Sequence, residues 1–161
     1  MASASLKELF TPSIASEDFE ETEESIIGLS FKYGDKHYCT SITNVKEIID
    51  FPHIIPLPVA SDKTLGVFNL RGNIIPVLDP EEHLIKIQKL HRHKASAVFS
   101  RMKLRLIVFE VAPDAAVAFP VYEVGKCEVT QEEATSEQGF IRINGIPHEK
   151  FDINVFVGGN L

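Results

Sequence analysis

The side chains of this sequence that could bind a metal or act as nucleophiles are few and lie in no recognised arrangement. The two cysteines, Cys39 and Cys127, form no Cys-x-x-Cys pair and are interpreted as reduced, part-buried thiols. His83, His91 and His93 cluster, but no second ligand pair follows at zinc-site spacing. There is no Gly-x-Ser-x-Gly nucleophile motif and no glycine-rich phosphate loop. The sequence therefore predicts no catalytic residue, no metal site and no cofactor. It favours a binding module over the alternative of a small hydrolase built on cysteine and histidine.

One arginine stands where its charge needs an explanation. Arg71 lies in "GVFNLRGNIIPVLD" (66–79), between two apolar runs of strand type and directly before Gly72, which suits a turn with φ > 0. An arginine among apolar neighbours usually pairs with a carboxylate or with backbone carbonyls. Glu47 is the candidate partner, so we predict a Glu47–Arg71 ion pair. The alternative for Arg71 is a solvent-facing side chain beside a turn. The alternative for Glu47 is a capping role with Asn44, which does not exclude the ion pair.

Composition and charge limit the classes of partner. The 161 residues carry a formal net charge of −7 and are 44% hydrophobic, so a core can form. An acidic chain of this kind is not expected to bind nucleic acid or an anionic membrane. The sequence contains no run of eighteen apolar residues, so no membrane-spanning helix is predicted, and no secretory signal is evident. "SEDFEETEES" contains six acids and no base, which predicts an acidic, disordered tail over 1–24 and a folded domain over 25–161.

The elements that must position these residues are mostly short strands. In the first half of the chain the pattern predicts a hairpin turning at Gly34-Asp35, a short helix-like segment at 44–49, a proline-broken crossing at 50–58 and a hairpin at 67–78. A helix over 84–90 and a basic loop at 91–94 are expected to follow. The remaining predicted elements are a hairpin turning at Pro113-Asp114, a capped helical turn at 130–134 and two strands within 139–157. The last turn is either Asn144-Gly145 or 147–150. Many short strands with few helices indicate small β-barrels or a sandwich.

Two blocks of the sequence resemble a known family. "VKEI" at 45–48, followed by "GVFNLRGNIIPVLD" at 66–79, resembles the CheW-like domain of bacterial chemotaxis coupling proteins. The likeness extends over residues 25–157, and the positions that match the family's pattern in the second block are Gly66, Asn69, Leu70, Arg71, Gly72, Ile74, Pro76, Val77 and Asp79. The resemblance implies a mainly β fold of two packed SH3-like five-stranded β-barrel subdomains with short helices.

The resemblance also implies a function and a site. The implied protein is not an enzyme but a scaffold that couples the cytoplasmic tip of a chemoreceptor (a methyl-accepting chemotaxis protein) to the regulatory domain of the histidine kinase CheA. It would be cytoplasmic and recruited to membrane-bound receptor arrays. The implied receptor-binding groove and its ion pair comprise Val45, Glu47, Ile48, Asn69, Arg71 and Gly72.

The chain departs from the family's pattern outside that block. Pro80-Glu81-Glu82 follows it, Tyr122 stands where an aspartate is usual, and 80–103 is longer and more basic than is typical. These departures favour receptor binding over kinase coupling. The alternative function is therefore a receptor- or peptide-binding CheW-like module that acts without a kinase.

Overall fold

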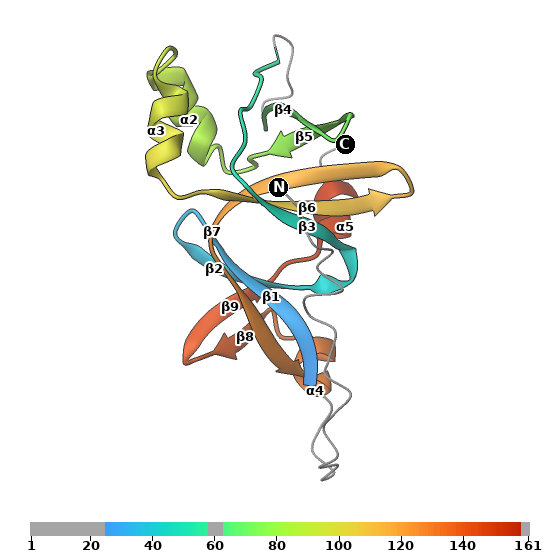
Figure 1. Cartoon of the computed structure of the whole chain (residues 1–161). Helices are drawn as coiled ribbons and strands as arrows, with labels where there is room; N and C mark the ends of the chain where they lie inside the picture. Colours follow the sequence, from blue (N-terminus) through green and yellow to red (C-terminus); the bar gives the residue numbers. More distant parts are fainter. Residues whose placement is uncertain (1–24, 58–62, 159–161) are drawn as a thin grey trace. The chain divides into compact units, whose positions relative to one another are not determined.

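The structure of the chain is a computed structural model that describes residues 25–57 and 63–158. These residues form two compact units, both built mainly of strands (Figure 1). One unit comprises the described residues up to Thr43 and from Glu123 onward, and the other is Asn44–Tyr122. The predicted mainly β fold is confirmed. The acidic segment 1–24, predicted as a tail, lies outside the described residues.

The unit formed by the two ends of the described chain is a sheet with the strand order β7-β1-β2-β9-β8. Its elements are β1 (Ser25–Tyr33), β2 (Lys36–Ser41), the second half of β7 (Ala115–Thr130), α4 (Gln131–Thr135), β8 (Phe140–Ile143), β9 (Ile146–Lys150) and α5 (Ile153–Gly158). β1 and β2 form the hairpin predicted around Gly34-Asp35. Thr130 Oγ1 accepts a hydrogen bond from Glu133 N at 3.1 Å, so the capped helical turn is also confirmed.

The C-terminal part of this unit settles one open prediction and corrects another. β8 and β9 are joined by Asn144-Gly145, whose φ values of 51° and 80° suit a two-residue hairpin turn. The competing turn at 147–150 lies inside β9. The segment that continues to residue 157, predicted as strand, is instead the helix α5. Its β-branched residues favour a strand locally, but Ile153 and Val157 are one helical turn apart and both are buried.

The central unit contains the two sequence blocks that resemble the coupling proteins. After a 3₁₀ turn (Ile42–Asn44), its elements are β3 (Val45–Asp50), β4 (Thr64–Leu70), β5 (Asn73–Leu78), α2 (His83–Leu90), α3 (Ala95–Arg101), β6 (Arg105–Ala112) and the first half of β7. β3 pairs with β6, β6 with β7, and β5 with β4. β5 also meets β7 at Val77↔Ala118. The hairpins predicted at 67–78 and around Pro113-Asp114 are both present.

The segment predicted as helix-like at 44–49 is a strand, which corrects the capping interpretation of Asn44 and Glu47. In β3, Glu47 lies opposite Val108 and Ile48 lies opposite Ile107. The backbone hydrogen bonds and apolar burial supplied by β6 outweigh a local capping signal, and β-branched residues such as Ile48 suit a strand. Pairing with a strand sixty residues later could not be read from the spacing of Asn44 and Glu47.

Two helices follow the β4–β5 hairpin. α2 is the helix predicted over 84–90, and the predicted loop 91–94 is the turn that leads to α3, which was not predicted (Figure 1). The fully buried Asp79 holds the start of α2, since its carboxylate accepts hydrogen bonds from the backbone N–H groups of His83, Leu84 and Ile85 at 2.7–3.1 Å. Asp79, the last residue of the block at 66–79, therefore has a structural role.

The proline-broken crossing lies against β4. Ile55 and Val67 exchange two backbone hydrogen bonds of 2.8 and 2.9 Å, which make an isolated bridge. Gly66 permits this approach, because a Cβ at that position would lie 2.4 Å from the carbonyl oxygen of Ile55. The crossing is thus fixed to the same strand that leads into the Arg71 turn.

Candidate functional site

The turn between β4 and β5 has a conformation that costs free energy. Leu70 pairs with Asn73, which leaves Arg71 and Gly72 as a two-residue loop with φ values of 49° and 91°. Two positive values are typical of a type I′ hairpin turn. Glycine adopts this conformation freely, but an arginine there costs roughly 1–2 kcal/mol. Sequence reasoning assigned positive φ to Gly72 only, because arginine has no preference for it.

Neighbouring groups hold the turn in place. The side chain of Asn69 accepts a hydrogen bond from the backbone N–H of Gly72 at 2.8 Å. This bond bridges the last residues of β4 and the second residue of the loop, so it fixes the direction in which the loop leaves the strand. Strained backbone that persists in this way often marks a functional position.

Arg71 and Glu47 are in contact, although 24 residues separate them in the sequence. Arg71 Nη2 donates a hydrogen bond to Glu47 Oε1. The pair is asymmetric, because the Glu47 side chain is 3% exposed and the Arg71 side chain is 58% exposed. Among the described residues, no hydrogen-bond donor reaches the other carboxylate oxygen, Oε2. A buried carboxylate without compensation is unstable, so Arg71 supplies the charge that Glu47 requires.

A β-bulge places Glu47 at this position. The register between β3 and β6 shifts between Val45, which faces Phe109, and Glu47, which faces Val108. Such bulges bend a strand and redirect its side chains. Here both Val45 and Glu47 are buried, while Lys46 between them is exposed.

The six predicted groove residues therefore fall into two sets. Val45 and Glu47 are buried and support the site from within. Asn69, Arg71 and Gly72 are exposed at the hairpin tip, and Ile48 is half-buried.

The structure adds one residue that the site prediction omitted. Ile74 follows the turn, pairs with Asn69 across the hairpin and is 62% exposed. The signal was available in the sequence, because Ile75 and Val77 alternate as core residues and so Ile74 and Pro76 must face the other way. An exposed isoleucine beside an anchored arginine is a surface suited to contact with another protein.

The residues with possible catalytic or metal-binding chemistry do not assemble into a site. Within 25–57 and 63–158, no three histidine, cysteine or acidic side chains could hold a metal ion together. Cys39 and Cys127 are both buried and lie in one apolar cluster. A hydrogen bond from Cys127 lowers the pKa of the Cys39 thiol, and the same contact with burial raises the pKa of Cys127.

Comparison with known proteins identifies the family. The family model for the CheW-like domain matches residues 28–147, which include both sequence blocks and the whole Glu47–Arg71 site. The chain belongs to the CheW-like domain family.

Individual relatives agree with this family. A chemotaxis protein CheW of Rhizobium meliloti is 39% identical over 51 residues, which are 32% of this chain and 33% of that protein. The CheW of Helicobacter pylori is 37% identical over 59 residues, covering 37% and 36% of the two chains. The match to the CheW of Thermotoga maritima is longer, with 29% identity over 106 residues, 65% of this chain and 63% of that protein. The matched part thus spans about a third of the first two relatives and under two thirds of the third.

A solved structure supports the fold. The scaffolding protein TtCheW from Thermoanaerobacter tengcongensis superposes with a TM-score of 0.58 over 79% of this chain and 88% of that one, at 19% identity. The two-barrel architecture implied by the resemblance is consistent with this CheW scaffold.

Proposed function

We propose that this protein is a non-enzymatic adaptor that couples the cytoplasmic tip of a chemoreceptor to the histidine kinase CheA. The observation that carries the proposal is the Arg71–Glu47 contact at a strained turn, within a CheW-like domain. A chain keeps an arginine in an unfavourable conformation when the resulting position of its side chain is needed. In this proposal, the receptor-binding surface requires the positive charge of Arg71 in a fixed position.

The chemistry of this surface suits recognition of a protein helix or loop. Asn69 and Gly72 define the turn, Arg71 presents a charged side chain anchored at one end, and Ile74 adds apolar area. Arginine beside exposed apolar residues is a combination that recurs at interaction hot spots.

None of the helices in the described part of the chain is long and apolar enough to cross a membrane. We infer a cytoplasmic protein that reaches membrane-bound receptor arrays through its partners.

The experiment measures binding of the full chain to a receptor-tip fragment and, separately, to the CheA regulatory domain. Arg71→Gln and Glu47→Gln each disturb the pair and should weaken receptor-tip binding by about tenfold, or about 1.4 kcal/mol. Arg105→Gln is the matched control, since Arg105 forms an exposed ion pair with Asp50 at 3.8 Å in the same unit. It should bind like the wild type. Wild-type receptor affinity in both Arg71→Gln and Glu47→Gln would refute a role for the pair.

A receptor- or peptide-binding module without kinase coupling is the second candidate. The α2–α3 segment favours it, because its length and its exposed basic side chains depart from the family's pattern outside the Arg71 block. The two binding measurements separate the candidates. Receptor-tip binding without CheA binding supports the second, and binding to both fragments supports the first.

A further inference from the structure

The positive charge of this chain is concentrated in one segment. Residues 83–105 contain seven of the sixteen lysines and arginines and no acidic residue, although the whole chain has a net charge of −7. All seven cationic side chains are exposed, and they are Lys86, Lys89, Arg92, Lys94, Arg101, Lys103 and Arg105. Such local concentration of one charge on an oppositely charged protein points to an anionic partner for the α2–α3 region.

A groove of about 680 Å³ lies between α3 and the crossing segment that follows β3. Its apolar lining includes Phe51 and Phe99, whose rings are 5.6 Å apart in an edge-to-face arrangement, and the buried Ile54 and Leu104. This volume falls within the range of about 300–1,000 Å³ that is usual for ligand-binding pockets. The groove can therefore enclose an apolar side chain.

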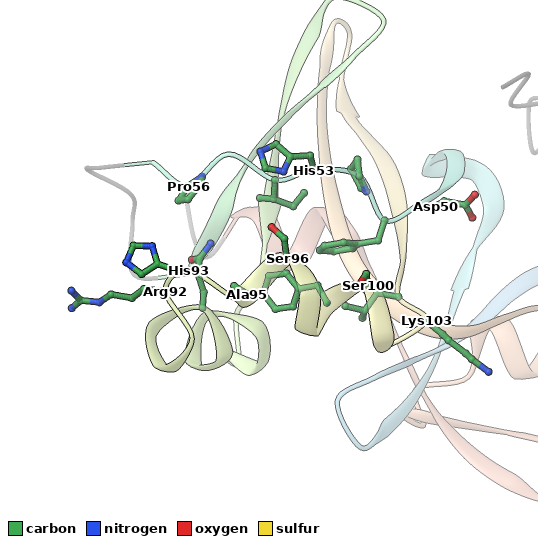
Figure 2. Close-up of a pocket in the computed structure, with 15 residues that line it drawn as sticks. Asp50, His53, Pro56, Arg92, His93, Ala95, Ser96, Ser100 and Lys103 are labelled. Atoms are coloured by element: carbon green, nitrogen blue, oxygen red, sulfur yellow. The ribbon is translucent and has the colours of Figure 1, made fainter.

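The polar side chains of the groove are arranged around this apolar lining. Figure 2 shows Ser96 on α3 and His53 on the crossing segment, with Arg92 and Lys103 at opposite ends. The lining includes one carboxylate, that of Asp50, and Arg105 Nε lies 3.8 Å from it. An apolar centre with a cation at each end is complementary to an apolar side chain that has carboxylates on both sides.

We propose that this groove binds an acidic segment of a partner protein, in which an aromatic or large aliphatic side chain is flanked on both sides by aspartate or glutamate. The apolar side chain would lie on Phe51 and Phe99, and the flanking carboxylates would approach Arg92 and Lys103. The groove is separate from the Arg71 surface in its residues, so the proposal goes beyond receptor coupling and does not depend on it.

Other anionic partners fit these features less well. A nucleic acid is bound through many phosphate contacts, and the net negative charge of the chain opposes its approach. An anionic membrane requires an apolar face that protrudes between the cations, whereas Leu90 is the one strongly exposed large apolar residue of 83–105, and Phe99 and Leu104 line a concave groove. Both remain as competing outcomes in the test.

The test titrates the full chain onto a fluorescein-labelled peptide with the core Glu-Asp-Phe-Glu-Glu and follows fluorescence anisotropy. Two control peptides carry Gln-Asn-Phe-Gln-Gln and Glu-Asp-Ala-Glu-Glu. We expect each control to bind about tenfold more weakly than the acidic phenylalanine peptide, because each lacks one of the two features. Affinity should also fall from 0.1 M to 1 M salt, as the screening length shortens from about 10 Å to about 3 Å.

Matched protein variants locate the binding. Arg92→Glu with Lys103→Glu reverses the two charges at the ends of the groove, and Lys86→Glu with Lys89→Glu makes the same change in net charge on α2, outside the groove lining. Ser96→Phe occupies the groove without altering charge. We expect the groove double variant and Ser96→Phe to weaken binding about tenfold or more, and the α2 double variant less than about threefold. Thermal unfolding followed by circular dichroism checks that all variants remain folded.

Several outcomes would overturn the proposal. Equal losses in the two double variants would show a general electrostatic attraction with no role for the groove. Tighter binding of a single-stranded oligonucleotide or of phosphatidylserine vesicles than of the peptide would assign the cations to another partner. Residues 17–21 of the chain, "EDFEE", have the same sequence as the core of the probe peptide and could compete with it. If the peptide binds only when the four acids at 17–21 are changed to their amides, the occupant is this chain and not a partner.

Discussion

Replacing Arg71 with alanine should destabilise the protein far more than neutralising Glu47, because only the glutamate is buried. Arg71→Ala removes the charge that compensates a carboxylate with 3% of its side chain exposed. Breaking a wholly buried ion pair costs about 3–5 kcal/mol. The Arg71 side chain is 58% exposed, so water screens the pair, and we expect a smaller loss of about 1–3 kcal/mol. For a chain of this length a loss of about 2 kcal/mol lowers the melting temperature by roughly 4–8 °C.

Neutralising the other partner has a different effect. In Glu47→Gln the buried group becomes an uncharged amide of the same size, and Arg71 keeps its contact with water. We expect a change in the free energy of unfolding of at most about 1 kcal/mol. The double variant Arg71→Ala with Glu47→Gln should be more stable than Arg71→Ala alone, since no buried charge is left without its partner. Urea unfolding of the four proteins, followed by circular dichroism, gives the three differences.

A glycine at position 71 is a further control, because it separates the loss of the ion pair from the cost of the turn conformation. Arg71→Gly removes the ion pair but also removes the cost of positive φ for a residue with a side chain, about 1–2 kcal/mol. It should therefore be more stable than Arg71→Ala. The reasoning fails if Glu47→Gln is as destabilising as Arg71→Ala, or if the two losses simply add in the double variant.

Three other predictions concern the buried residues Asp79, Gly66 and Cys127. Asp79→Ala should cost about 2 kcal/mol or more in urea unfolding, because three backbone N–H groups at the start of α2 lose a buried acceptor. Gly66→Ala should cost at least about 2 kcal/mol, since its Cβ would meet backbone at 2.4 Å, whereas Gly139→Ala, with nothing within 4 Å, should be near neutral in the same assay. Cys127→Ala removes the hydrogen bond that lowers the pKa of Cys39, so that pKa should rise and the pH profile of Cys39 alkylation should shift to higher pH.

The sequence predicted features that depend on a few neighbouring residues. The hairpin at 67–78 and its turn followed from Gly72 between two apolar runs, and the α4 cap followed from Thr130 and Glu133. The Glu47–Arg71 contact followed from a rule of a different kind, that an arginine among apolar residues needs a partner, with the glutamate of the 44–49 segment chosen as that partner.

The features that sequence reasoning missed depend on distant parts of the chain. Asn44 and Glu47 have capping-box spacing, but β6 decides their conformation. Ile153 and Val157 read as strand residues until burial at helical spacing is known. The helix α3 was missed because it is one and a half to two turns long and starts directly after a basic loop, although Ala95 and Phe99 are buried one turn apart.

The Arg71 block can be specific while the rest of the chain diverges, because its parts depend on one another. Asn69 fixes the turn, Gly72 permits its positive φ, and the unusual φ of Arg71 accompanies its contact with Glu47 on a different strand. Glu47 in turn is buried in the domain and takes its position from the bulge in β3. Changing one member leaves a strained turn or a buried charge without compensation. The α2–α3 segment supplies none of these contacts, so its length and positive charge can differ without disturbing the Glu47–Arg71 pair.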